Sequence, residues 1–165
     1  ENILQLAIIE SGKLNLEKDL VDLHRLIRET VSRFQIFIDQ RNAVVNLNLQ
    51  AAQFELLADK THIGNVFYNL IDNALKYAPN DTQIDIFTYE TNQHLGVQIS
   101  DNGIGISKER QQQIFKKFYR APKMKAAGFG LGLNYVQQIV RAHQAKLEVE
   151  SEEGKGTSFT ILFEK

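Results

Sequence analysis

The sequence predicts an α+β fold in which a layer of helices covers one face of a mixed, mostly antiparallel sheet. Two stretches carry apolar residues at three- and four-residue spacing, as amphipathic helices do. Other segments alternate apolar and polar residues, as half-buried strands do, and single helices separate pairs of them. The chain has 165 residues, of which 43% are hydrophobic and 24% charged, so we expect one globular domain with a real core.

Composition excludes several classes of function. The formal net charge is −1, so no overall field favours nucleic acid or an anionic membrane, and we expect neither as a partner. The absence of cysteine removes disulfides, thiolate metal sites and cysteine nucleophiles. No apolar run approaches the roughly 20 residues that span a bilayer. The chain starts at Glu1 with a segment that resembles the middle of a helix, so we expect a piece of a longer protein.

The first half of the chain predicts helices around two short strands. A helix is expected to end at Ser11 and Gly12, and an amphipathic helix is expected from 19 to 41. Strands are expected at 43–50 and 54–58. Asp59 is a plausible N-cap for a helix that runs to about Tyr77. Its inner stripe would consist of Ile63, Val66, Phe67, Leu70, Ile71 and Leu75.

The second half predicts two hairpins with helices between them. Strands at 82–90 and 94–100 are joined by a short turn, and Ser107 is expected to cap a helix to about Lys117. A loop rich in Lys, Ala and Gly precedes a helix from 131 to 143. Strands at 145–151 and 157–164 flank the turn "EEGKG" and close the chain.

Three asparagines recur every four residues on the helix that follows Asp59. Asparagine is a mediocre helix former, so Asn65, Asn69 and Asn73 on one stripe require an explanation. They could simply be polar surface opposite the core. Alternatively, amide oxygens on a rigid helix suit Mg²⁺, with Lys76 available for phosphate and Tyr77 for a base. The residues alone leave the two interpretations about equal.

Two glycine clusters suggest loops that approach a ligand. "DNGIGI" (101–106) follows a strand, but neither the dinucleotide fingerprint nor the P-loop pattern is present. Asp101 is a hydrogen-bond acceptor and suits a ligand group that donates, such as an exocyclic amine, although a tight turn is the commoner meaning of such a motif. "GFGLGL" (128–133) precedes a helix and follows a basic run, which is typical of an anion site beneath a mobile lid but also of a solvated face.

Taken in order, these motifs closely resemble the catalytic and ATP-binding domain of sensor histidine kinases, in the superfamily of gyrase, the Hsp90 chaperones and MutL. The resemblance implies the Bergerat ATP-binding fold, with about five strands and three main helices on one face. It places domain boundaries at 1–12, a remnant of the last dimerisation-domain helix and linker, and 13–165, the ATP-binding domain. The matching motifs are the N box "NLIDNALKYA", the G boxes "DNGIGI", "GFGLGL" and "GKGTSF", and the F box "IFKKFYRA".

The resemblance implies ATP and Mg²⁺ as cofactors. Asp101 would bind the adenine amino group, and Asn73 would be the direct metal ligand. Asn69, Lys76 and Arg120 would be the catalytic residues. The implied ATP-binding residues are Asn69, Asn73, Lys76, Tyr77, Asp101, Gly103, Gly105, Ile106, Tyr119, Arg120, Gly128, Gly130, Leu131, Gly132, Leu133 and Thr157.

The resemblance also implies a histidine as phosphoryl acceptor, on a dimerisation domain that this chain lacks. Hydrolysing branches of the superfamily have a glutamate where Asn69 stands, and an amide cannot act as a base, so poor hydrolysis is expected. His24 lacks the acidic residue and proline of the family's acceptor motif, and we expect it to be a solvated helix residue. "HQA" replaces the family's paired glycines after the helix that ends at His143.

The implied partners are the dimerisation and histidine phosphotransfer domain and a response regulator. The fragment is expected to be a cytoplasmic monomer, and the parent a homodimer; whether the parent is anchored in the inner membrane is left open. Two alternatives remain: an ATP-driven clamp or hydrolase, disfavoured by Asn69, and a non-catalytic nucleotide module or soluble serine kinase. Intact Asn73, Asp101 and glycine motifs disfavour a dead module.

Overall fold

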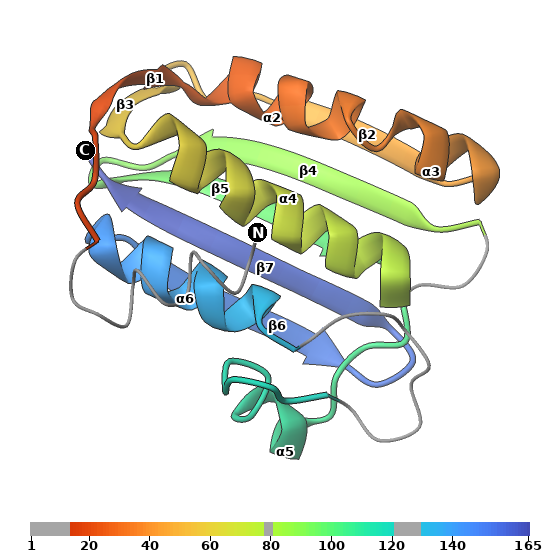
Figure 1. Ribbon diagram of the computed structural model, residues 1–165. Coiled ribbons are helices and arrows are strands. Elements are labelled where there is room, and N and C mark those ends of the chain that lie inside the picture. Colours follow the sequence, from red (N-terminus) through yellow and green to blue (C-terminus); the bar gives the residue numbers. More distant parts are fainter. Residues whose placement is uncertain (1–13, 78–80, 121–129) are drawn as a thin grey trace.

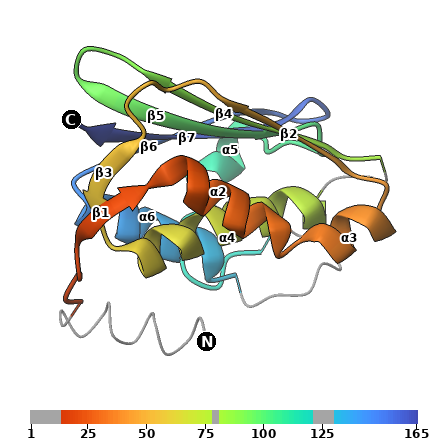
Figure 2. The same cartoon turned by 90° about the horizontal axis from the view of Figure 1, so that it is seen from above.

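The helices lie on one face of a mixed five-stranded sheet, which confirms the predicted fold class (Figures 1 and 2). The computed structural model describes residues 14–77, 81–120 and 130–165. The strand order is β2-β4-β5-β7-β6, and among the described strands only the β2–β4 pair is parallel. The five strands are β2 (Val44–Leu49), β4 (Gln83–Glu90), β5 (His94–Asp101), β6 (Lys146–Glu152) and β7 (Gly156–Glu164).

Alternation along the central strands explains why one face of the sheet is covered. In β4, Ile84 and Ile86 are fully buried while Asp85 between them is not, because successive side chains point to opposite faces. The register places Val97 of β5 opposite Ile161 of β7 on the covered face, and both are fully buried. The other face carries mainly polar side chains, so the core lies between the sheet and the helices.

Three helices form the second layer: α2 (Leu23–Ser32), α4 (Lys60–Tyr77) and α6 (Gly132–Ala142). Helix α4 packs between the other two (Figure 1). Asp59 caps it as predicted, because the backbone N–H of His62 donates to Asp59 Oδ1 at 3.0 Å. All six residues of the predicted inner stripe of α4 are buried, which anchors the asparagine side chains of this helix relative to the sheet.

The expected continuous helix from 19 to 41 is wrong. Asp19–Asp22 forms β1, which pairs antiparallel with β3 (Glu55–Ala58) in a separate two-stranded sheet. Helix α2 starts only afterwards, where Asp22 Oδ1 accepts from the Arg25 backbone N–H at 2.8 Å. A second break follows α2, where the buried ring of Phe34 packs on Tyr68 before α3 (Gln35–Gln40) begins. Pairing with a distant strand and packing on another helix override the local periodicity.

The expectation that His24 is solvated is also wrong. His24 is 8% exposed, its ring stacks on Phe54 at 4.6 Å, and its Nε2 pairs with Thr88 Oγ1 at 2.8 Å. Burial, and then the nearby Arg28, lower the pKa of His24, so the neutral ring is favoured. His24 therefore joins α2 to β4 as part of the core.

Two further segments depart from expectation without altering the fold. Helix α5 (Lys108–Gln111) is shorter than predicted, because turns follow it and Asn134 Nδ2 holds the Phe115 carbonyl at 2.8 Å. Gln144, which follows α6, adopts a positive φ of 56°, the conformation that paired glycines would supply at low cost. No helix in the described ranges is both long and apolar enough to cross a membrane.

Candidate functional site

Asp101 lies at the end of β5, where the first glycine cluster begins. Its Oδ1 accepts the backbone N–H of Gly103 at 2.8 Å, which closes a tight turn around the carboxylate. Burial raises the pKa of Asp101 above its usual range, although backbone hydrogen bonds from Gly103 and Thr157 act in the opposite direction. The charged form is therefore incompletely compensated, and a ligand that donates a hydrogen bond to it would relieve that cost.

Ser151, on β6, holds the first glycine loop against the final hairpin. Its Oγ accepts the backbone N–H of Ile106 at 2.8 Å and donates to the carbonyl of Gly156 at 2.8 Å. Thr157 Oγ1 lies 2.9 Å from the same oxygen. Gln111 Nε2 donates to the carbonyls of Ile106 and Ser151, both at 2.8 Å. The loop thus has most of its backbone groups paired without any ligand.

Two glycines allow this loop and the final hairpin to touch through their backbones. Gly105 has φ 67°, and a Cβ there would lie 1.9 Å from the carbonyl oxygen of Glu152. Gly156 has φ 99°, and a Cβ there would lie 1.9 Å from the carbonyl oxygen of Asp101. Neither position tolerates a side chain. The motif "GKGTSF" by itself indicates only a hairpin turn. In the fold, its Gly156 packs directly on the first glycine loop.

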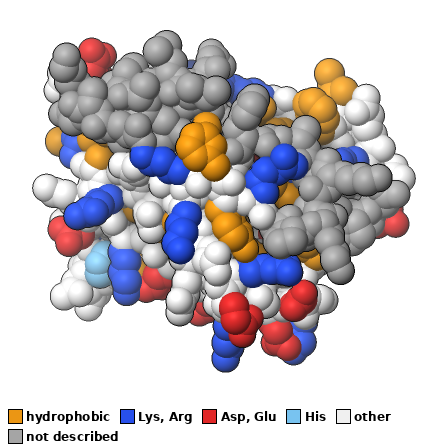
Figure 3. Space-filling model, turned by 60° about the horizontal axis from the view of Figure 1, so that its bottom comes forward, with side chains coloured by type: hydrophobic (Ala, Val, Ile, Leu, Met, Phe, Trp, Pro, Cys, Tyr) orange, Lys and Arg blue, Asp and Glu red, His pale blue; other side chains and the backbone are white. Residues whose placement is uncertain are grey.

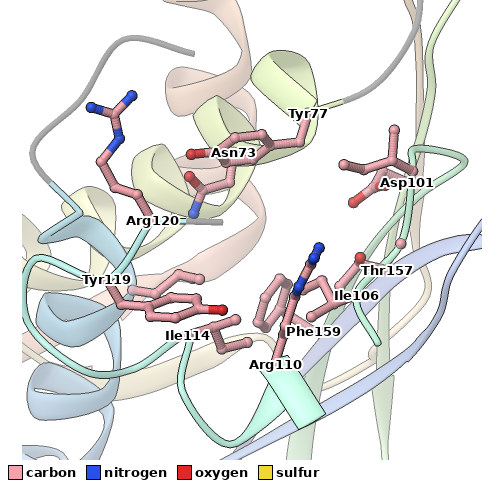
Figure 4. Close-up of a pocket in the computed structure, with 13 residues that line it drawn as sticks. Asn73, Tyr77, Asp101, Ile106, Arg110, Ile114, Tyr119, Arg120, Thr157 and Phe159 are labelled. Atoms are coloured by element: carbon pink, nitrogen blue, oxygen red, sulfur yellow. The ribbon is translucent and has the colours of Figure 1, made fainter. Parts of the chain in front are cut away.

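A pocket opens between the C-terminal half of α4, the first glycine loop, the segment around α5 and strand β7 (Figure 4). It brings together Asn73, Tyr77 and Asp101 from opposite sides, with Thr157 beside Asp101. These four were predicted as site residues, and the fold gathers them. The full lining is Asn73, Tyr77, Asp101, Ile104, Gly105, Ile106, Arg110, Ile114, Tyr119, Arg120, Leu133, Thr157 and Phe159.

Asn73 is the candidate metal ligand, and its amide is unusually placed. Its Nδ2 is buried and has no hydrogen-bond partner among the described residues. A buried unpaired amide N–H costs free energy, and a ligand oxygen that accepts a hydrogen bond from it would remove that cost. An amide oxygen is a ligand that Mg²⁺ accepts, so the residue type fits a magnesium ion that also binds phosphate oxygens. No cluster of three or more His, Asp or Glu side chains able to hold a metal exists in the described chain.

Asn69 and Lys76 flank Asn73 but are held by partners within the helix. Asn69 Nδ2 donates to the Asn65 carbonyl at 2.7 Å. Lys76 Nζ forms an ion pair with Asp72 at 2.5 Å. Neither residue lines the pocket. For these two, the predicted contacts with phosphate require side-chain movement away from the present partners.

The second glycine cluster meets both α4 and the F-box segment. A Cβ on Gly132 would lie 2.5 Å from Asn69 Oδ1, so only glycine lets α6 begin this close to α4. Gly130 has φ 70°, and its carbonyl accepts the N–H of Phe118 at 2.9 Å. Leu131 is buried in the core, whereas Leu133 lines the pocket. Of the predicted residues, Gly128 lies outside the described ranges.

Basic side chains lie beside the pocket. Arg120 and Tyr119, both predicted, line it together with Arg110, which the sequence did not single out. Figure 3 shows Lys and Arg side chains gathered across the middle of one face, with Asp and Glu mainly toward its lower edge. The segment 108–120 contains one acidic residue, Glu109, and five basic residues: Lys108, Arg110, Lys116, Lys117 and Arg120. An anionic ligand would therefore meet positive charge here.

Sequence reasoning missed several residues that build the site. Ser151 and Gln111 gave no local signal, because a serine on a strand and a glutamine on a short helix are ordinary surface residues until the fold joins them. Phe159 has the pattern of a core strand residue, and Ile114 lies inside the helix that was expected from Ser107 to about Lys117. Arg110 lay in a segment that was interpreted only as a short helix capped by Ser107.

Comparison with known proteins adds independent information. Residues 58–165 match the family described as histidine kinase-, DNA gyrase B- and HSP90-like ATPases. The sensor protein RprX of Bacteroides fragilis is 36% identical over 166 residues, covering 98% of this chain and 32% of RprX. The sensor histidine kinase WalK of Bacillus subtilis is 31% identical over 166 residues, covering 97% of this chain and 27% of WalK. The chain thus spans about a third of the length of these relatives.

Solved structures agree with this assignment. The histidine kinase AdeS of Acinetobacter baumannii has a TM-score of 0.81 at 26% identity, covering 99% of this chain and 75% of AdeS. The catalytic domain of the histidine kinase ThkA also has a TM-score of 0.81 at 26% identity, covering 91% of this chain and 99% of that domain. The chain therefore belongs to the histidine kinase-, DNA gyrase B- and HSP90-like ATPases, as a catalytic domain of the kind found in sensor histidine kinases.

Proposed function

We propose that this domain binds Mg-ATP and transfers the γ-phosphoryl group to a histidine on a dimerisation domain of its parent protein, for relay to an aspartate of a response regulator. The observation that carries the proposal is one pocket that joins an acceptor suited to an amine, Asp101, to an oxygen ligand suited to Mg²⁺, Asn73. ATP carries an amino group on adenine at one end and phosphate oxygens that bind Mg²⁺ at the other. A structural relative, ShkA, was solved in complex with AMPPNP, and its TM-score of 0.86 at 20% identity supports the shared fold.

In this proposal each end of the pocket has a separate task. Asp101 accepts the adenine amino group, and Gly105 and Ile106 line the base with Tyr77 over it. Asn73 and Arg120 face the phosphates, and Mg²⁺ when bound neutralises charge on the phosphate oxygens. Phosphoryl transfer needs mainly positioning and charge stabilisation, so the chain requires no nucleophile of its own.

Asn69 favours transfer over hydrolysis. Its side chain is an amide bonded to the Asn65 carbonyl, and an amide cannot remove a proton from water. Water attack on the γ-phosphate would therefore be slow, and the phosphoryl group would be kept for a better-placed acceptor. Three of the chain's four histidines are poorly placed for that role: His24 is buried in the core, and His62 and His143 are engaged in hydrogen bonds.

The proposed partners follow from the same reasoning. ThkA was solved in complex with the response regulator protein TrrA, with a TM-score of 0.80 at 23% identity to this chain. We propose an equivalent response regulator and a dimerisation domain as partners here, with residues 13–165 as the ATP-binding unit and 1–12 as the remnant of the last dimerisation-domain helix and linker. The isolated chain would be a cytoplasmic monomer. Its parent would be a homodimer, either in the cytoplasm or anchored in the inner membrane.

A direct test mixes this chain with ATP radiolabelled on the γ-phosphate, Mg²⁺ and a separately made dimerisation domain of the same parent. Acid-labile label on that domain's histidine is the expected result. Omission of the dimerisation domain should leave the chain unlabelled. Steady phosphate release without labelled histidine would sink the proposal and favour a hydrolase.

A further inference from the structure

Arg110 enters the nucleotide pocket from the short helix α5, outside every motif that the family resemblance covers. It lines the pocket with Asp101, Ile106 and Thr157. In Figure 4 its side chain rises from α5, and the guanidinium ends on the side of Ile106 and Thr157, which line the pocket with it. The residue is half-buried. Its position therefore results from the fold around the pocket.

Among the residues that the structure describes, the guanidinium of Arg110 has no hydrogen-bonding or ion-pair partner. Its charge acts on the adjacent Glu109, whose pKa is lowered mainly by hydrogen bonds, yet that carboxylate is exposed. Lys76, by contrast, is neutralised by Asp72 at 2.5 Å. Because burial of an unpaired charge is costly, an arginine left in this state is suited to an anion that arrives from outside.

The base end of the pocket limits which anion this can be. Asp101 and Thr157, which line the pocket with Arg110, are the residues that would hold adenine. The first phosphate of a nucleotide is the one nearest to its base and ribose, whereas the terminal phosphates would lie toward Asn73 and Arg120. A guanidinium pairs with phosphate through two parallel hydrogen bonds, which a neutral base cannot match.

We propose that Arg110 is a specificity-determining residue that binds the α-phosphate and makes the pocket prefer nucleotides over nucleosides. This inference rests on the proposed function, because it assumes that adenine nucleotides occupy the pocket. It assigns a role distinct from that of Arg120: Arg110 recognises the phosphate common to AMP, ADP and ATP, whatever the length of the phosphate chain.

Calorimetric titration with adenosine, AMP, ADP and ATP tests the inference on wild type and on Arg110→Gln, which keeps length and loses charge. We expect about tenfold weaker binding of all three nucleotides and unchanged adenosine binding. Arg110→Lys should recover part of the loss, and low ionic strength should widen the difference between wild type and Arg110→Gln. Lys108→Ala is the matched control, since Lys108 is an exposed cation on the same helix and does not line the pocket.

The outcomes separate the two proposals. Wild-type AMP affinity in Arg110→Gln would overturn the inference, and so would an equal loss for adenosine, which would indicate a contact with the base. A loss confined to ATP would also overturn it, because that would place Arg110 at the terminal phosphates. If wild type bound none of the four ligands, the proposed function itself would fail. Thermal unfolding of each variant shows whether a loss of binding reflects a loss of fold.

Discussion

The two ends of the pocket differ in how far they are built before any ligand arrives. At the base end, Asp101 accepts the Gly103 N–H within the first glycine loop, and Ser151 of the final hairpin accepts the Ile106 N–H. At the phosphate end, the buried amide nitrogen of Asn73 has no partner among the described residues, and Lys76 is paired with Asp72. The contrast indicates that the base site is pre-organised, whereas the phosphate site is completed by metal and nucleotide.

The pre-organised end should show the largest effect of a single substitution. We expect Asp101→Asn to weaken both adenosine and ATP by roughly 10- to 100-fold, because a charged acceptor for the amino group is lost. The folded domain should not be destabilised at neutral pH. Burial raises the pKa of Asp101, so its charged form costs stability above that pKa, and asparagine removes this cost. Calorimetry and thermal unfolding measure the two quantities; unchanged adenosine affinity would show that the base does not bind at Asp101.

At the phosphate end, substitution should affect only ligands that carry phosphate and metal. Asn73→Ala should weaken Mg-ATP binding about tenfold and leave adenosine unchanged, since the side chain would serve the metal alone. Asn73→Asp keeps an oxygen ligand at this position and is the control. Titrations with and without Mg²⁺ separate the loss of metal-dependent binding from any loss of binding to the nucleotide alone. Equal loss of adenosine in Asn73→Ala would mean that the two ends are not separable.

Ser151 tests whether the base end depends on its hydrogen-bond support. Ser151→Ala leaves the Ile106 N–H without its acceptor and should lower the free energy of unfolding by about 1–2 kcal/mol. Adenosine and ATP should both weaken a few-fold, because the loop is less well held. Ser158→Ala is a matched control, since that hydroxyl bonds Ser100 on the uncovered face of the sheet at 2.9 Å. Chemical denaturation measures stability and calorimetry measures affinity. Equal losses of stability in the two variants, with no loss of affinity in either, would contradict the account.

The smallest expected effect concerns the far ends of the helices that carry the phosphate site. His143 Nδ1 donates to the Ile139 carbonyl at 2.9 Å, and its Nε2 accepts the Asp59 N–H at 3.0 Å, so the neutral ring joins α6 to the start of α4. Burial, the main cause, lowers the pKa of His143 from 6.5. Below the pKa of the unfolded state, unfolding therefore takes up a proton on His143. The stability that the neutral ring contributes is lost as the pH falls through 6.5 toward the lower pKa of the folded state.

Denaturation at a series of pH values measures that contribution. We expect the free energy of unfolding of the wild type to fall as the pH is lowered from about 7 to about 5.5. His143→Gln should flatten this part of the pH profile, since an amide does not titrate in this range. His24→Gln is the comparison, because His24 is also buried neutral but lies between α2 and β4. An unchanged profile in His143→Gln would show that His143 is not held neutral by its contacts.

The sequence was most informative where local periodicity and tertiary packing agree. Helix α4, its cap Asp59 and the β4–β5 hairpin follow the predicted bounds closely. The helix predicted from 19 failed because Asp19–Asp22 pairs with a strand more than 30 residues later, and periodicity does not report such pairing. Tyr77, Asp101 and Thr157 were predictable as motif residues, whereas Ser151 and Arg110 acquire a role only when the fold brings distant segments together.

The central claim is that the base site is pre-organised and that the ligand completes the phosphate site. Amide hydrogen exchange tests it most directly, measured on the free chain, on the chain with adenosine and on the chain with Mg-ATP. Slow exchange at Gly103 and Ile106 in the free chain is the result we predict, with little further change on adding adenosine. Amides of Gly132 and Leu133, at the start of α6, should gain protection only with Mg-ATP. Fast exchange at Ile106 in the free chain, or equal protection of both regions by adenosine alone, would contradict a pre-organised base site beside a phosphate site that the ligand completes.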